Sequence, residues 1–302
     1  MRTVLCESLV RHADDQRFIF LTGDLGYNAL EPLRAVMGQR FINAGVAEQN
    51  MVTVAAGLGM SGLRPWVYSI APFLYGRPFE QIRNDVCLHD IPVMLVGNGG
   101  GYAYGVMGCT HHALEDYGVL LTLPNLCVFV PAFALDVPAL IAKLQDFPHP
   151  AYLRLGKCEK PGDLVLPDYA PWRRLVKGGG ATMIVVGPLA GGILDAVRRL
   201  DESRRPDVWV VTELPILARE IPSEFLEDLE RSRHLFVVEE HVAHGGVGEM
   251  LARSLMLLGA VPETLTHRHA LGYVSGLYGS QQFHRQECGL DPDSLVASLS
   301  PS

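Results

Sequence analysis

The chain has few charged residues, no basic block and no long apolar run. Charged side chains make up 19% of its 302 residues, and the formal net charge is −8. Because no Lys/Arg cluster offsets that charge, a nucleic-acid partner is not expected. No apolar run reaches membrane-spanning length, and residues 1–15 lack the long apolar core of a signal peptide. We therefore expect a cytoplasmic protein with no membrane partner.

Cysteine is sparse and is not arranged for metal binding. No C-x-x-C pair occurs among the six cysteines, which are Cys6, Cys87, Cys109, Cys127, Cys158 and Cys288. This spacing argues against a structural zinc site or a dithiol redox motif, and no metal ligand is predicted on this chain. We expect reduced thiols, as in a cytosolic enzyme. The G-x-S-x-G motif of a nucleophile elbow is also absent.

The first half of the chain alternates short apolar runs with helical patterns. The length of 302 residues and the hydrophobic content of 48% suit two domains with a core each. We expect strands at 18–22, 66–69, 92–97 and 126–130, and a helix over 47–60. Strands that alternate with helices imply a mainly parallel sheet covered on both faces.

The same pattern restarts after residues 157–171, which are rich in proline, glycine and charge. Beyond that segment we expect strands at 182–186, 208–212 and 235–238, and helices over 189–200 and 248–258. The sequence therefore predicts an α/β fold of two parallel-type sheet domains, 1–165 and a smaller one at 172–302.

One carboxylate stands where a strand, a glycine turn and a helix follow one another, in NAGVAEQNM at 43–51. Glu48 falls in the first turn of the predicted helix, whose N-terminus favours its anionic form. The neighbours Val46, Met51 and Val52 would desolvate it and favour the neutral form. A glutamate between these two influences can share a proton with a ligand nitrogen. The alternative is an exposed glutamate that only stabilises the helix dipole.

Three other segments carry candidate side chains. Phe73 and Tyr75 could stack on a flat heterocycle, or they could be core aromatics. The glycine-rich run at 97–108 does not meet the G-x-G-x-x-G spacing, so a dinucleotide is not favoured. His111, which follows it, could bind a substrate oxygen or be structural. Arg154 could bind a phosphate or carboxylate, or form a surface ion pair.

These segments, taken together and in order, resemble the C-terminal half of transketolases, and most closely the small subunit of split transketolases. The resemblance covers nearly the whole chain. It rests on GDLG at 23–26, FINAGVAEQNM at 41–51, FLYGRPFEQIR at 73–83, CTHHALED at 109–116 and VVEEHVAHGGVGE at 237–249. It implies a thiamine-diphosphate pyrimidine-binding domain followed by a smaller transketolase C-terminal domain.

The resemblance also assigns roles. Glu48 matches the glutamate that hydrogen-bonds N1′ of the aminopyrimidine ring and promotes the imino tautomer, whose 4′ nitrogen removes the thiazolium C2 proton. Phe73 matches the ring that stacks on the aminopyrimidine. The other implied cofactor contacts are Asp24, Ile70 and Tyr75. His111 is implied as the second catalytic residue, facing substrate hydroxyls. The implied substrate contacts are His112, Arg2, Asn28, Arg154 and, less directly, Arg77.

The sequence departs from the family pattern beside the predicted substrate site. The family's T-H-Q motif is Thr110-His111-His112 here, and Met107 replaces the acidic residue that precedes it. A second substrate-facing histidine is replaced by Gly99. Two polar contacts to a sugar are therefore missing, and a buried hydroxyl without a partner binds less well. A specialised or less hydroxylated substrate is a hypothesis that fits these changes.

The G-D-G…N motif, with which the family binds the diphosphate and Mg²⁺ (or Ca²⁺), is absent. We therefore expect a second subunit that carries it, an α₂β₂ heterotetramer, and self-association through both domains of this chain. The implied reaction transfers a two-carbon ketol unit between phosphorylated or otherwise modified sugars. Alternatives are a 2-oxo-acid dehydrogenase E1 β-type subunit, a 1-deoxyxylulose-phosphate-synthase-like subunit, and a non-catalytic partner that retains the fold. The T-H-x-A-L-E-D segment favours the transketolase type over the dehydrogenase type.

Overall fold

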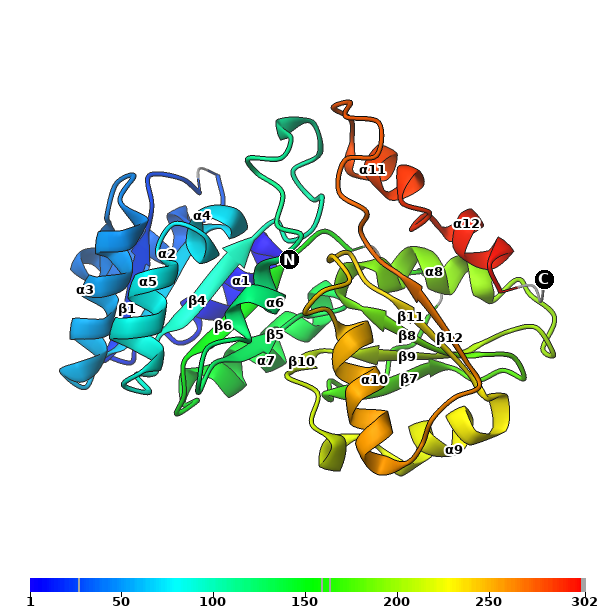
Figure 1. Cartoon of the computed structure of the whole chain (residues 1–302). Coiled ribbons are helices and arrows are strands. Elements are labelled where there is room, and N and C mark those ends of the chain that lie inside the picture. Colours follow the sequence, from blue (N-terminus) through cyan, green and yellow to red (C-terminus); the bar gives the residue numbers. More distant parts are fainter. Residues whose placement is uncertain (27, 159, 163, 300–302) are drawn as a thin grey trace.

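Two mostly parallel sheets lie side by side in the computed structural model, which describes residues 1–26, 28–158, 160–162 and 164–299 (Figure 1). The first sheet has seven strands in the order β10-β5-β6-β4-β3-β1-β2, and the second has five in the order β12-β11-β8-β9-β7. The predicted α/β class with two parallel-type sheets is therefore confirmed.

The first sheet is parallel except at one edge. Its strands are β1 (Phe18–Thr22), β2 (Phe41–Asn43), β3 (Arg64–Ile70), β4 (Met94–Asn98), β5 (Cys127–Phe129), β6 (Ala151–Leu155) and β10 (Glu213–Leu214). β10 comes from the second half of the chain and pairs antiparallel with β5. The first sheet is thus completed by a strand that lies beyond the predicted domain boundary, and the boundary itself stays a prediction.

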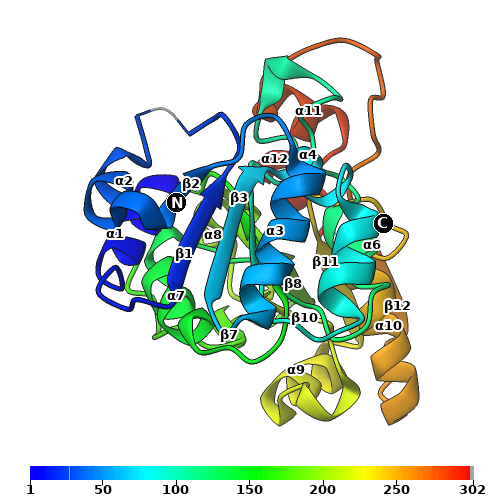
Figure 2. The ribbon, with the colours of Figure 1, turned by 90° about the vertical axis from the view of Figure 1, so that its left-hand side faces the viewer.

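Helices cover both faces of this sheet because successive side chains of a strand point to opposite sides. Phe18 and Phe20 of β1 pack into one apolar cluster, and Ile19 and Leu21 pack into another. The first cluster includes residues of α1 (Arg2–Val10), α2 (Glu31–Met37) and α7 (Val137–Gln145). The second includes residues of α3 (Glu48–Met60), α4 (Ala71–Tyr75), the π-helical segment Ile82–Cys87 and α6 (Asp116–Leu120). Figure 2 shows these two groups of helices on either side of β1 and β3.

The second sheet consists of β7 (Trp172–Val176), β8 (Thr182–Val186), β9 (Asp207–Val211), β11 (His234–Val238) and β12 (Thr264–Arg268). Only β7 runs antiparallel to its neighbour, β9. The helices of this half are α8 (Ala190–Val197), α9 (Ser223–Ser232), α10 (Val247–Leu258), α11 (Gln281–Glu287) and α12 (Pro292–Ala297). The remaining helical pieces are α5 (Phe79–Gln81) and short 3-10 turns at Gly38–Arg40, Gly105–Met107, Ala134–Asp136, Gly187–Leu189 and Ala218–Glu220.

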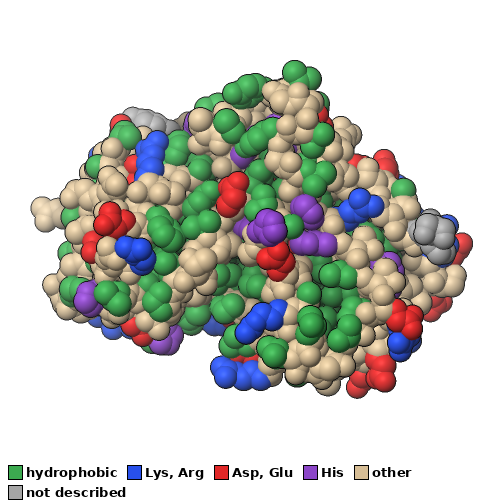
Figure 3. Space-filling view, viewed as in Figure 1, with side chains coloured by type: hydrophobic (Ala, Val, Ile, Leu, Met, Phe, Trp, Pro, Cys, Tyr) green, Lys and Arg blue, Asp and Glu red, His purple; other side chains and the backbone are tan. Residues whose placement is uncertain are grey.

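The two halves share buried apolar surface. One apolar cluster contains Val52 and Leu95 of the first half together with Leu214, Phe225 and Leu251 of the second. On the face of the molecule that Figure 3 turns to the viewer, histidine side chains gather near the middle, with acidic side chains close by. Within the described part of the chain, no helix is both long enough and apolar enough to cross a membrane.

Candidate active site

The predicted cofactor residues gather where parallel strands of the first sheet end, at the edge where open α/β sheets bind ligands. Asn43, the last residue of β2, joins two of these strand ends. Its Nδ2 donates to Asp24 Oδ1 at 3.0 Å, and its Oδ1 accepts a hydrogen bond from the Gly45 N–H at 2.9 Å. Asp24 is thereby fixed beside the turn that leads into α3, although its side chain stays exposed.

Glu48 is the first residue of α3 and is only 4% exposed. Two side chains donate hydrogen bonds to its carboxylate: Ser69 Oγ near the end of β3, at 3.4 Å, and Arg77 Nη1, at 2.9 Å. The Arg77 side chain is 44% exposed. A buried carboxylate is costly without a partner, and here the cationic partner reaches it from the solvent side. The alternative of an exposed, dipole-stabilising glutamate does not fit this burial.

Arg77 also lies on Phe73. The carbon at the centre of its guanidinium is 3.9 Å from the centroid of the Phe73 ring, in a cation–π arrangement. The imidazole of His111 contacts the same phenyl ring edge-on, with centroids 5.2 Å apart. The structure therefore brings Glu48, Arg77, Phe73 and His111 into one row. Arg77, predicted only as a loose phosphate contact, occupies the middle of it.

Ile70 and Tyr75 flank this row in sequence. Ile70 ends β3 and is half-buried, directly before α4. The Tyr75 hydroxyl donates to Glu115 Oε2 at 3.0 Å. Burial and the nearby Glu115 carboxylate raise the pKa of Tyr75. Tyr75 therefore links α4 to the residues that follow His111, and its predicted contact with a cofactor stays a prediction.

His111 and His112 lie in different surroundings although they are adjacent in sequence. His111 is partly exposed, and its Nδ1 is 2.9 Å from Thr110 Oγ1. His112 is 3% exposed, and both of its ring nitrogens contact protein groups, the Gly105 carbonyl oxygen at 2.8 Å and the Tyr273 hydroxyl at 3.0 Å. Only His111 of this pair joins the row with Phe73.

Apart from Arg77, the residues predicted to bind a sugar phosphate have no hydrogen bond or ion pair with Glu48 among the described residues. Arg154 on β6 is 3% exposed and forms a 2.8 Å ion pair with Asp116. It also donates to the carbonyl oxygens of Ala113 and Glu240, at 2.9 and 3.0 Å. Its guanidinium is thus bonded within the protein.

Arg2 and Asn28 are exposed. Asn28 has a positive φ of 58°, and its backbone N–H donates to Glu31 Oε1 at 2.7 Å. Burial raises the pKa of the Tyr68 and Tyr104 phenols, and the charge of Arg2 acts in the opposite direction on both. The predicted roles of these two residues in binding a sugar phosphate stay predictions.

Tyr104 is a site residue that the sequence pattern does not single out. Gly99, directly after β4, has a φ of +83°, and the Tyr104 ring fills the space that a Cβ on Gly99 would need. Asn98 Nδ2 donates to the Tyr104 hydroxyl at 2.8 Å, and the Tyr104 ring lies 5.9 Å from the His111 ring. The space that a side chain at position 99 would need is therefore filled by a phenol. Met107 is 53% exposed.

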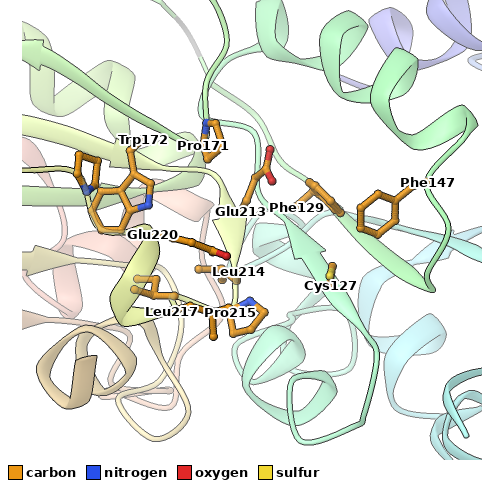
Figure 4. Close-up of a pocket in the computed structure, with 12 residues that line it drawn as sticks. Cys127, Phe129, Phe147, Pro171, Trp172, Glu213, Leu214, Pro215, Leu217 and Glu220 are labelled. Carbon is orange, nitrogen blue, oxygen red and sulfur yellow. The ribbon is translucent and has the colours of Figure 1, made fainter. Parts of the chain in front are cut away.

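A hollow of about 560 Å³ lies elsewhere, around β10, where the two halves meet (Figure 4). Cys127 and Phe147 line it from the first half, and Trp172 and Leu217 from the second. None of the predicted site residues lines this hollow, so it is separate from the row at Glu48. Among the described residues, no group of three or more His, Cys, Asp or Glu side chains could hold a metal ion.

Known proteins resemble the chain along most of its length. Residues 7–161 match the family model described as the transketolase pyrimidine-binding domain. A subunit of the apulose-4-phosphate transketolase of Actinobacillus succinogenes is 33% identical over 85% of this chain and 83% of its own length. The protein named 1-deoxy-D-xylulose-5-phosphate synthase 2 of Geobacter sulfurreducens is 31% identical over 98% of this chain, but over only 48% of its own.

Solved structures agree with these sequence matches. A structure described as a split-gene transketolase, an inactive β4 tetramer, covers 99% of this chain and 96% of its own with a TM-score of 0.81 and 28% identity. The transketolase of Campylobacter jejuni shares the fold, with a TM-score of 0.74 at 16% identity over 98% of this chain. With a family model over half of its length and a relative at 33% identity, the chain belongs to the transketolase family.

Proposed function

We propose that this chain is the pyrimidine-binding subunit of a split, thiamine-diphosphate-dependent transketolase that moves a two-carbon ketol unit between phosphorylated sugars. Two relatives that match most of this chain are named as subunits of apulose-4-phosphate transketolases. The observation that carries the proposal is the buried carboxylate of Glu48, placed at a helix start and joined through Arg77 to the face of the Phe73 ring.

The Arg77 guanidinium makes the contacts that an aminopyrimidine ring would make at this site, so it shows whether the surrounding residues fit such a ring. It is flat, it bears N–H groups, it lies over Phe73 at 3.9 Å, and it donates to Glu48 at 2.9 Å. Stacking on an aromatic face and a hydrogen bond to a carboxylate are the two contacts that the pyrimidine requires. Because the Arg77 side chain is 44% exposed, it has room to turn into solvent when the ring binds.

When bound, thiamine diphosphate supplies the nucleophilic carbon that breaks and remakes the bond next to a ketose carbonyl. In our proposal the residues of this chain orient the cofactor and hold a proton. Glu48, fixed by Ser69 and by the start of α3, shares a proton with N1′ of the pyrimidine. Phe73 holds the ring by stacking. His111 and Tyr104 offer polar atoms on the substrate side of Phe73.

We propose that the diphosphate and its Mg²⁺ are held by a second, unlike chain in an α₂β₂ assembly. Two facts support this: the G-D-G…N motif is missing from the sequence, and a similar solved chain, described as a split-gene transketolase, forms an inactive β4 tetramer. In this proposal the active site is completed only between unlike chains.

A second candidate reaction is that of a 1-deoxyxylulose-phosphate-synthase-like enzyme. The Geobacter relative of that name matches 98% of this chain. The two reactions differ in a simple readout, because the synthase type releases CO₂ from pyruvate. A reconstituted complex that transfers ketol units without releasing CO₂ supports the transketolase proposal, and the reverse result supports the second candidate.

The role of Glu48 is tested in the complex of this chain with a co-expressed G-D-G…N subunit, assayed with apulose 4-phosphate and other ketose phosphates. Glu48→Gln is expected to lower kcat by about 10²- to 10⁴-fold, because it removes a positioned proton-transfer group. Glu249→Gln, at an exposed first-turn glutamate of α10, is the matched control and should leave kcat unchanged.

Two results would contradict the proposal. A loss of only a few-fold in Glu48→Gln would indicate a non-catalytic partner that retains the fold. Full turnover by the chain without the second subunit would exclude the split assembly.

A further inference from the structure

The loop that carries His111, residues 99–112 and called here the histidine loop, is in contact with the second half of the chain. His112 is the centre of that contact. Its ring stacks on Tyr273 with centroids 5.6 Å apart and an interplanar angle of 14°. The Tyr273 hydroxyl is 3.0 Å from His112 Nδ1.

The bonding pattern of His112 fixes which atoms donate. Nε2 faces the Gly105 carbonyl oxygen at 2.8 Å, and a carbonyl only accepts, so Nε2 carries the hydrogen. Nδ1 of the neutral ring is then the acceptor, and the Tyr273 hydroxyl donates to it. Burial lowers the pKa of His112, which favours this neutral form. The imidazole thus ties the start of the 3-10 turn Gly105–Met107 to Tyr273.

Other contacts from residues 272–281 support the same loop. Gly108 has a φ of +75°, and the ring of Tyr278 fills the space that a Cβ there would need. A Cβ on Gly105 would lie 3.0 Å from the backbone nitrogen of Gln281. The Tyr102 hydroxyl donates to the Gly272 carbonyl oxygen at 2.6 Å. These glycines let a segment from the second half lie directly on the histidine loop.

We propose that Tyr273, acting through His112, is a positioning residue for His111 and Tyr104, so that the second half of the chain takes part in substrate recognition. His111 precedes His112 in the sequence, and the backbone N–H of His111 donates to the Gly108 carbonyl oxygen at 2.9 Å. A loop this rich in glycine gains little rigidity from its own backbone. Backbone bonds to Leu155 and Ala113 and a bond to Glu240 hold residues 99–102, so residues 272–281 are left to order the part of the loop that carries His111. The catalytic part of this inference rests on the proposed function.

The positioning itself is tested on the whole chain without any partner, by amide hydrogen exchange. Tyr273→Phe keeps the stacked ring but removes the donor to His112. Exchange at Gly105, Met107, Gly108 and His111, whose amides are bonded within the loop, should then speed up about fivefold, the order expected for one lost hydrogen bond. Tyr278→Phe removes a hydroxyl from the same segment while its ring stays on Gly108, so loop exchange should match the wild type. Unchanged loop exchange in Tyr273→Phe overturns the proposal.

The consequence for recognition is tested in the assembled complex. Tyr273→Phe should lower kcat/KM for the ketose phosphate about fivefold, matching the lost hydrogen bond, and leave the Kd for thiamine diphosphate unchanged. A purely structural loss would lower both affinities and the thermal midpoint together. Faster loop exchange with unaltered kcat/KM overturns the role in recognition. If the wild-type complex has no ketol-transfer activity, the proposed function fails, and the exchange result still decides the positioning.

Discussion

At the scale of the residue, the contact between Arg77 and Glu48 has two opposing effects: it stabilises the carboxylate, and it occupies the place of the proposed cofactor ring. Arg77 stabilises a carboxylate that is 4% exposed, and it does so from the place that a stacked pyrimidine would take. In the proposed complex, a cofactor would have to displace the guanidinium to reach Glu48. The cost of that displacement would weaken the binding of the cofactor.

Replacing Arg77 should therefore have opposite effects on stability and on binding. Arg77→Ala leaves Glu48 without its cation, and we expect the chain to lose about 1–2 kcal/mol of unfolding free energy. In the assembled complex, the Kd for thiamine diphosphate should fall by about tenfold, because no guanidinium has to move. Urea denaturation and titration calorimetry measure the two quantities. Arg83→Ala, at an exposed arginine of the nearby π-helical segment Ile82–Cys87, serves as the control. Weaker cofactor binding in Arg77→Ala would show that Arg77 contacts the cofactor directly.

Local sequence patterns indicate some of the residues that the structure brings together and miss others, for a physical reason. Glu48 and Phe73 are marked by local patterns, a helix start after a glycine turn and an aromatic after a strand, and the structure brings them together. The sequence pattern indicates a lost contact at Gly99, because a pattern cannot show which side chain fills the space that a glycine leaves. Tyr104 fills it. The inward ion pair of Arg154 joins residues 38 positions apart, which no local pattern reveals.

At the scale of the element, Arg154 holds strand β6 to helix α6. Its Nε donates to Asp116 Oδ2 at 2.8 Å, and the Tyr152 hydroxyl donates to the same oxygen at 2.9 Å. Both charged side chains are almost completely buried, at 3% and 0% exposed. A pair of this kind stabilises little in total, but breaking it leaves a buried charge without a partner.

Arg154→Met should accordingly lower the unfolding free energy of the chain by about 3–5 kcal/mol. Arg17→Met, which breaks the exposed ion pair with Asp15, should cost at most about 0.5–1 kcal/mol. Urea denaturation of both variants provides the comparison. If Arg154→Met kept its stability and instead lost affinity for sugar phosphates in the assembled complex, the predicted phosphate role of Arg154 would be supported over the structural one.

The helices and strands also divide into those that a local sequence pattern specifies and those that depend on contacts with distant residues. The strand predicted at 18–22 is β1, and the helix predicted over 47–60 begins one residue later as α3. Both are specified by long or fully apolar patterns. The two-residue strand β10 was not predicted, because a strand of that length has no periodicity and exists only through its pairing with β5.

At the scale of the whole molecule, the two halves are joined more closely than composition suggests. The segment at 157–171 has the proline and glycine content of a linker, and it does separate the last parallel strand of the first sheet from the second sheet. Composition cannot show that the chain returns to the first sheet at β10 or that residues 272–281 lie on the histidine loop. These returns make the stability of each half depend on the other.

That shared stability should depend on pH in two steps. Burial lowers the pKa of His112, His234 and His241 below the ordinary value of 6.5. In the unfolded chain these histidines take up protons as the pH falls through 6.5, whereas the folded chain keeps them neutral. Their contribution to stability is therefore present above pH 6.5 and is lost as the pH falls below it.

The second step comes from two buried carboxylates. Burial alone would raise the pKa of Glu239 and Glu240, but hydrogen bonds from His267 and the Gly248 N–H to Glu239, and the charge of Arg285 beside Glu240, bring both below 4.5. A lowered carboxylate pKa contributes stability that is present above pH 4.5 and lost as the pH falls through the folded-state value. The urea midpoint of the chain should thus fall as the pH drops below about 6.5, and should fall further below about pH 4.5. His234→Gln should reduce the first fall and leave the second, because burial alone lowers the pKa of His234 and no carboxylate changes. A midpoint that stays constant from pH 8 to 5.5 would mean that these histidines titrate alike in the folded and unfolded chain, and the burial that joins the two halves at His112 and His241 would have no energetic consequence.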